Sequence, residues 1–157
     1  TCLEHPTVVE QIGPENIDRI KGYHGQYSSL LLDETQAHLV HADYDPATIL
    51  VDKIEGKWKI TAILDWEFAH SGGSTLLDVA NMLRYAHHMP PIFEEAFLQG
   101  LTQGGVTLPE NWRISLHLLN VSALLDCLVR CTPKESPHRC ADIRALIDHI
   151  LLELEKM

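Results

Sequence analysis

Three oxygen-bearing side chains are spaced along the first half of the chain in a pattern that suits phosphoryl-transfer chemistry. Asp43 stands two residues after His41, and Thr48 follows five residues later. Asp65 comes directly after a β-branched, alternating segment. Transfer of a γ-phosphoryl group needs a carboxylate near the attacking hydroxyl and metal ions held by protein oxygens. Asp43 suits the first role, and Thr48 and Asp65 suit the second.

The stretch that contains these residues resembles the active-site segments of the aminoglycoside phosphotransferase and choline kinase family, relatives of the protein kinases. The family's catalytic loop is approximately His-Gly-Asp-x-x-x-x-Asn, and residues 41–48 read His-Ala-Asp-Tyr-Asp-Pro-Ala-Thr. Its metal-binding segment is Ile-Asp-Trp/Phe-Glu, and residues 63–67 read Ile-Leu-Asp-Trp-Glu. A further family aspartate, at a helix start, is matched by Asp78. Three segments in the correct order, with strands between them, make the resemblance specific.

Carried over position by position, the resemblance implies a role for each of five residues. Asp43 would be the catalytic base, or would orient the substrate hydroxyl. Asp65 would bind Mg²⁺ together with Thr48, which stands where the family has Asn. His41 would fix the loop through hydrogen bonds, and Asp78 would support the loop by accepting backbone hydrogen bonds from it.

The resemblance therefore implies an ATP-dependent phosphotransferase that acts on a hydroxyl of a small molecule, with ATP and Mg²⁺ as cofactors. It does not identify the substrate, because relatives phosphorylate aminoglycosides, sugars, choline-like alcohols and homoserine-like amino acids. Nor does it point to particular substrate-binding residues in this sequence.

Two departures from the family pattern bear on activity. The hydroxyl of Thr48 has a shorter reach than an Asn amide, and Asp45 is an alternative ligand nearby. No glycine-rich loop, strand Lys or partner Glu precedes His41, and the forty residues before it read as helix. We therefore expect a C-terminal lobe without the ATP-binding N-terminal lobe, inactive by itself. The alternative interpretation is a non-catalytic remnant or pseudokinase lobe that serves as a binding module.

The elements expected around this segment make a mainly α fold of the α+β class, the C-terminal lobe of a protein-kinase-like fold. The first fourteen residues are expected to be irregular, with Pro6 and Pro14 as breaks. Two alternating, β-branched runs, 48–53 and 58–64, flank a turn with Gly and predict a β-hairpin. A glycine-containing loop over 71–74 offers a Ser or Thr cap to the next helix.

Helical periodicity, interrupted by Pro and Gly, predicts one helix before the hairpin and four after it, over residues 15–36, 75–88, 91–103, 109–131 and 137–156. The last helix carries a stripe that we expect to be buried, made of Ile143, Leu146, Ile147, Ile150, Leu151 and Leu154. We expect a single domain over 1–157. Its parts are a leading segment with a helix, the catalytic loop with the hairpin, and a helical subdomain, over residues 1–36, 37–70 and 74–157.

Composition narrows the expected partners. Acidic residues number 22 and basic residues 12, for a formal net charge of −10, which disfavours nucleic acid because phosphate contacts need clustered Lys and Arg. The most apolar stretch, 114–129, is interrupted by His117, Asn120 and Asp126, so a buried helix is expected and not a membrane span. The partner expected is a small hydroxyl-bearing molecule. Self-association, or packing of the missing lobe, is expected on an exposed apolar face.

The four cysteines, Cys2, Cys127, Cys131 and Cys140, are too few to indicate a disulfide framework, and no signal peptide leads the chain. This predicts a reducing, cytoplasmic setting. A zinc site made of Cys127, Cys131, His138 and Cys140 is the alternative, because Zn²⁺ takes such ligands. Cys127 and Cys131 fall in an apolar helix, however, where Cys usually acts as a small hydrophobe.

Overall fold

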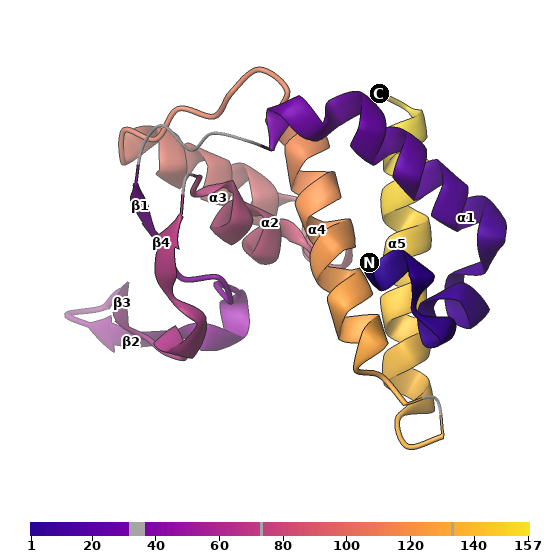
Figure 1. The fold of residues 1–157 in the computed structure, drawn as a ribbon. Coiled ribbons are helices and arrows are strands. Elements are labelled where there is room, and N and C mark those ends of the chain that lie inside the picture. Colours follow the sequence, from indigo (N-terminus) through magenta and orange to yellow (C-terminus); the bar gives the residue numbers. More distant parts are fainter. Residues whose placement is uncertain (32–36, 73, 133) are drawn as a thin grey trace. The chain divides into compact units, whose positions relative to one another are not determined.

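A computed structural model describes most of the chain, namely residues 1–31, 37–72, 74–132 and 134–157 (Figure 1). Within these residues the fold is mainly helical with short antiparallel strand pairs, which confirms the predicted α+β class. The chain divides into two compact units, one of Thr1–Leu32 with Arg113–Met157 and one of Asp33–Trp112. The helical part predicted over 74–157 is thus shared between the two units, and the single domain over 1–157 stays a prediction.

The first unit is built from three long helices, α1 (Pro6–Tyr27), α4 (Trp112–Val129) and α5 (Pro137–Glu155). Their apolar side chains form one core that includes Ile20, Leu118, Val121, Leu128, Ile147 and Leu151. All six residues of the predicted α5 stripe are buried, so this prediction is confirmed. The stripe recurs at three- and four-residue intervals, which places it on one side of the helix.

The start of α1 differs from the prediction. Residues before Glu15 were expected to be irregular, but the helix begins at Pro6, and Val8 and Ile12 in its first turns are buried. Proline is tolerated at the first helical position, where its missing N–H has no intrahelical partner. Gly13 interrupts the helix with φ 80° and ψ 159°, and a second helical segment begins directly after it at Pro14, next to the predicted start at Glu15. The helix ends at Tyr27, earlier than the predicted end at residue 36, and Ser28–Leu30 form a 3-10 helix instead. The last part of the prediction falls on residues 32–36, outside the described ones.

Helix α4 is the apolar helix expected near the centre. Of the helices that the structure describes, this one is long and apolar enough to cross a membrane by length and composition. Core helices of globular proteins pass the same test, and Leu118, Val121 and Leu128 of α4 are fully buried in the core of the first unit. The expectation of a buried helix agrees with this packing.

A disulfide links Cys131, just after α4, to Cys140 in the first turn of α5. This bond was not expected, since Cys131 was interpreted as a small hydrophobe. The disulfide also engages two of the four side chains of the alternative zinc site, Cys131 and Cys140, so they are not thiolates. Among the described residues, no group of three or more His, Cys, Asp or Glu is placed to hold a metal ion. Cys2 and Cys127 are free thiols.

Replacing both Cys131 and Cys140 by Ser is expected to lower the free energy of unfolding by roughly 2 to 3 kcal/mol, because the bond restricts the unfolded chain between them. Urea unfolding of the oxidised protein and of the double variant measures the difference. Reduced wild type should match the double variant, and Cys2→Ser should match oxidised wild type. Equal stability of the double variant and the oxidised protein would show that the bond contributes nothing.

The second unit contains the predicted hairpin, formed by β2 (Ile49–Ile54) and β3 (Lys57–Ile63). Glu55 and Gly56 connect the strands with φ values of 51° and 79°. Two consecutive left-handed residues are the geometry of the two-residue turn that matches strand twist. The register pairs Ile49 with Ile63, with an irregularity at Leu50 and Val51. The hairpin prediction is therefore confirmed.

A second strand pair joins β1 (His38–Val40) to β4 (His70–Gly72) in antiparallel register. Residues 71–74 were expected to form a loop, so the assignment of Ser71 and Gly72 was wrong. Gly72 fits against β1 because it has no side chain, since a Cβ there would lie 3.0 Å from Cγ2 of Val40. The pair closes the segment between residues 40 and 70, so both ends of the predicted active-site region start from one small sheet.

Helices α2 (Leu76–Leu83) and α3 (Ile92–Gln103) complete the second unit. Helix α3 agrees with the prediction, but the helix predicted over 75–88 stops at Leu83 and gives way to a turn and a short 3-10 helix over Ala86–His88. The hydroxyl oxygen of Ser74 accepts a hydrogen bond from the Leu76 amide at 3.1 Å. Ser74 precedes the N-cap residue Thr75, whose own side chain makes no capping hydrogen bond, so the cap expected for α2 is not formed at the N-cap.

Candidate active site

The catalytic-loop segment leaves β1 through His41, whose imidazole joins two parts of the site. The side chain is 3% exposed. Its Nε2 lies 2.8 Å from the carbonyl oxygen of Leu64, and its Nδ1 lies 3.3 Å from the backbone nitrogen of Asp43. The Asp43 amide donates to Nδ1, so the proton of the neutral ring is on Nε2 and is donated to Leu64. His41 therefore links Asp43 of the catalytic loop to Leu64, the residue before Asp65.

The next residue, Ala42, adopts a left-handed conformation with φ 68°, which side-chain-bearing residues rarely do. The backbone amides of His41 and Ala42 are both bound by the carboxylate of Asp78 in α2. Asp78 accepts from the His41 amide through Oδ2 and from the Ala42 amide through Oδ1, each at 2.9 Å. The chain is thus turned sharply just before Asp43, which is half-buried.

Thr48 and Asp65 are brought to the same end of the hairpin. The carbonyl oxygen of Thr48 accepts from the Leu64 amide at 2.8 Å, which extends the β2–β3 pairing by one step. Asp65 follows with φ 61° and is exposed; Asp is among the residues that tolerate this left-handed region. The two residues predicted to bind metal therefore occupy neighbouring backbone positions.

The side chain of Thr48 already has a structural partner. Its hydroxyl donates to the carbonyl oxygen of Asp45 at 2.9 Å, and the residue is 5% exposed. Asp45, the alternative ligand, caps the short 3-10 helix Pro46–Thr48, because its Oδ1 accepts from the Ala47 amide at 2.7 Å. The Thr48 oxygen retains lone pairs, but its orientation is set by the turn that it closes.

The oxygen donors present suit Mg²⁺ in chemical type. Mg²⁺ at phosphate-transfer sites uses one or two carboxylates, and substrate phosphates and water complete its coordination. Asp65, one of the two residues predicted to bind the metal, is exposed, so its carboxylate is accessible to an ion. This fits an ion that arrives together with a nucleotide.

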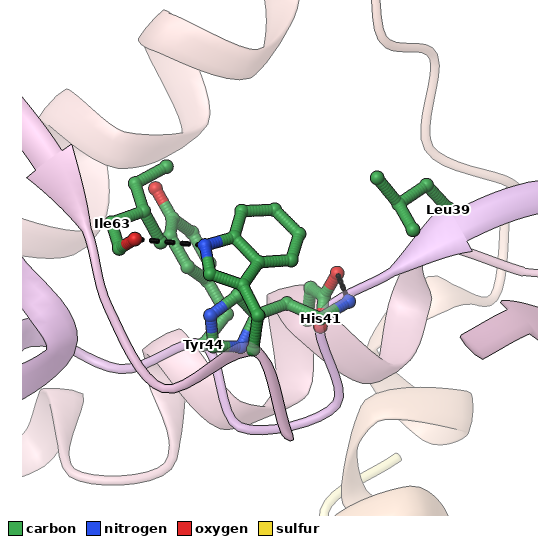
Figure 2. Close-up of a pocket in the computed structure, with 6 residues that line it drawn as sticks. Leu39, His41, Tyr44 and Ile63 are labelled. Atoms are coloured by element: carbon green, nitrogen blue, oxygen red, sulfur yellow. Dashed lines mark hydrogen bonds between the residues drawn. The ribbon is translucent and has the colours of Figure 1, made fainter. Parts of the chain in front are cut away.

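A mainly apolar pocket of about 200 Å³ lies against the catalytic loop (Figure 2). Six residues line it: Leu39, His41, Tyr44, Ile63, Trp66 and Asp78. The imidazole of His41 contacts the Trp66 ring at a centroid distance of 4.5 Å and the Tyr44 ring at 5.8 Å. Trp66 is itself fixed because its indole N–H donates to the Ile63 carbonyl at 2.8 Å. Aromatic packing thus holds the loop and the Asp65 segment together.

Tyr44 is the titratable group of this pocket whose pKa is clearly shifted. Burial raises the pKa of the Tyr44 hydroxyl, and the negative charge of Asp78 raises it further. Both causes disfavour the phenolate form, one by removing water and the other by repulsion. Tyr44 is therefore an uncharged hydroxyl at neutral pH and not a base.

Two contributors to the site were not predicted from the sequence. Trp66 was treated as part of a motif and was given no role, although its ring packs on His41. Asn81 of α2 was not considered, yet it is 3% exposed and its amide donates to the Ala42 carbonyl at 2.8 Å. An isolated Asn among apolar helix residues is a usable signal, because a buried amide must find hydrogen-bond partners.

The sequence pattern of the phosphotransferase enzyme family matches residues 10–114. This stretch makes up most of the chain and includes Asp43, Asp65 and Asp78. The chain therefore belongs to the phosphotransferase enzyme family, and the resemblance found in the sequence is confirmed. No curated protein and no solved structure matches the chain.

Proposed function

We propose that the protein transfers the γ-phosphoryl group of ATP to a hydroxyl of a small molecule, and that this chain is the lobe that carries the catalytic loop. In this reaction the hydroxyl oxygen forms a bond to the γ-phosphorus. The bond from that phosphorus to the β–γ bridging oxygen breaks, and ADP leaves with the electron pair. The hydroxyl proton passes to the carboxylate of Asp43.

The observation that carries this proposal is the fixed geometry just before Asp43. Ala42 stands in a left-handed conformation, and Asp78 binds both amides that lead into the turn. A catalytic carboxylate must be held in place because small misplacements of reacting groups cost large factors in rate. Asp43, which is half-buried, directly follows this supported turn.

Asp65 is the residue that would hold Mg²⁺ in this proposal, with Thr48 as the second ligand. When bound with the nucleotide, the ion neutralises negative charge on the phosphates. Leu64, which precedes Asp65, is bonded through its carbonyl to His41 and through its amide to Thr48. Two hydrogen bonds to the backbone of Leu64, one from the His41 side chain and one to the Thr48 carbonyl, therefore constrain the position of Asp65 relative to the catalytic loop.

The direct test is a transfer assay on the protein expressed with whatever coding sequence lies in frame on either side. ATP labelled in the γ-phosphate is incubated with a panel of aminoglycosides, sugars, choline-like alcohols and homoserine-like amino acids. We expect label to appear in at least one hydroxyl compound with Mg²⁺ and to disappear with EDTA. Absence of both transfer and Mg²⁺-dependent nucleotide binding would overturn the proposal.

The second candidate is a non-catalytic lobe that binds a ligand or partner, and Thr48 is the observation that favours it. Thr48 replaces the family Asn, and its hydroxyl is engaged with Asp45. Under this proposal calorimetry detects no Mg²⁺-dependent nucleotide binding. A gain of binding in Thr48→Asn would then identify this residue as the defect.

The proposed partners and location can be checked separately. Val51 and Ile60 are opposite each other on the hairpin and are 55% and 60% exposed, and this face is where we propose that a second copy or a further lobe packs. A monomer in sedimentation at high concentration would count against the second copy.

We propose a cytoplasmic location. Because structural disulfides are rare there, the in-cell redox state of Cys131 and Cys140 tests this part.

A further inference from the structure

Asn81 is a buried amide in an otherwise apolar part of α2. It is 3% exposed, and its neighbours Val79, Ala80, Met82 and Leu83 are buried too. A buried polar side chain costs stability unless hydrogen bonds satisfy it. The Nδ2 of Asn81 donates to the carbonyl oxygen of Ala42 at 2.8 Å. Residue 81 therefore contacts the loop at the residue just before Asp43.

A second contact fixes which way the amide of Asn81 points. The guanidinium of Arg84 donates to Oδ1 of Asn81, and Arg has donors but no acceptor. The amide oxygen must therefore face Arg84, and the NH₂ group must face Ala42.

Asp78 and Asn81 stand three residues apart, so they share one face of α2. Asp78 accepts from the N–H of Ala42, and Asn81 donates to the C=O of the same residue. Together they bind both backbone polar groups of the residue with φ 68°. The two contacts have opposite hydrogen-bond polarity, because the Asp78 carboxylate can only accept and the Asn81 NH₂ group donates.

We propose that Asn81 is a positioning residue that, together with Asp78, holds Ala42 in its left-handed conformation and so sets the position of the Asp43 carboxylate. Alanine in this conformation is strained, and glycine is not. The family motif has Gly where this chain has Ala42. The contact from Asn81 compensates for the strain that the Ala42 side chain introduces at this position. The catalytic part of this inference rests on the proposed function, but the holding of Ala42 does not.

A double-mutant cycle between Asn81→Asp and Ala42→Gly tests the proposal. Aspartate has the same shape and keeps an acceptor for Arg84, but when ionised it has no donor for the Ala42 carbonyl. We expect N81D at pH 8 to reduce the hydrogen-exchange protection of the Ala42 amide roughly tenfold or more. In the A42G background, the same change should reduce protection at residue 42 much less, because Gly adopts this conformation unaided.

Turnover gives the second readout of the cycle. In the transfer assay N81D is expected to lower kcat roughly tenfold to a hundredfold with little change in KM for ATP, since the reacting group is displaced and not the nucleotide. Adding A42G to N81D should restore most of the lost kcat. Asn111→Asp, an exposed loop change of the same charge, is the matched control and should alter neither readout.

The outcomes separate the two proposals. If N81D behaves like N111D, or if A42G does not diminish its effect on amide protection, the positioning role is wrong. If wild type shows neither transfer nor Mg²⁺-dependent nucleotide binding, the proposed function falls and so does the effect of Asn81 on turnover, whereas the exchange data still decide whether Asn81 holds Ala42. Circular dichroism checks that N81D folds. Asn81→Ser, which is uncharged and shorter, runs the same cycle if N81D does not fold.

Discussion

Asp43→Asn is expected to lower kcat for phosphoryl transfer about 10²- to 10⁴-fold, the usual contribution of a general base. The substituted amide has nearly the same shape but cannot take the hydroxyl proton. Among the described residues, the carboxylate of Asp43 accepts no hydrogen bond, and Asp43 is bonded to His41 through its backbone amide. Its replacement should therefore leave the free energy of unfolding within about 0.5 kcal/mol of wild type.

The measurement is single-turnover transfer with γ-labelled ATP and the best substrate of the panel, paired with a thermal melt. Asp52→Asn is the matched control, because it removes the same charge from the exposed hairpin, where Asp52 bonds the neighbouring Lys53 amide. It should keep full turnover. If D43N also kept full turnover, Asp43 could not be the base, and the carboxylate would have to be assigned a different role.

The elements that depend on local signals were predictable from the sequence. The β2–β3 hairpin follows from two alternating runs around Glu55 and Gly56, which adopt the left-handed turn. The buried stripe of α5 follows from its helical spacing. In both cases the information lies within about 20 residues, where propensity and pattern act together.

The elements that depend on distant partners were not predictable in this way. Strand β4 is three residues long, and it exists because Val40 and its neighbours pair with it across some thirty residues. The Cys131–Cys140 bond requires that the end of α4 and the start of α5 meet. The early start of α1 reflects burial of Val8, which overrides the weak helix signal near Pro6. Tertiary packing supplies this information, and local sequence does not.

The candidate site shows the same division. Its motif residues could be named from spacing alone, because Asp43, Thr48 and Asp65 form a linear pattern. The residues that hold them could not be named so easily, since Asn81 meets Ala42 across 39 positions and Trp66 meets His41 by ring packing. Motifs record which groups react, and contacts determine where those groups are placed.

Replacing Asp78 by Ala is expected to lower the free energy of unfolding by about 3 kcal/mol, because hydrogen bonds to a charged acceptor contribute about 1.5–3 kcal/mol each and two are lost. Both run to backbone amides at the left-handed turn, from His41 and Ala42. Asp78 is half-buried, which places the sum at the lower end. Urea unfolding measures the change. Asp148→Ala, which removes one exposed hydrogen bond from Asn16, should cost less than about 1 kcal/mol.

Asp78→Asn distinguishes the loss of hydrogen bonds from the loss of charge. Its single amide oxygen can accept from one of the two loop amides, while its NH₂ group opposes the other, so its stability should fall between wild type and D78A. Removing the charge should also lower the pKa of Tyr44, which burial keeps above its ordinary value and which the Asp78 charge raises further. Ultraviolet titration of Tyr44 in D78N, with Tyr44→Phe to assign the signal, measures that fall. If the pKa of Tyr44 did not move while stability dropped, Asp78 would act on the loop through hydrogen bonds alone, and its charge would have no part in the pocket.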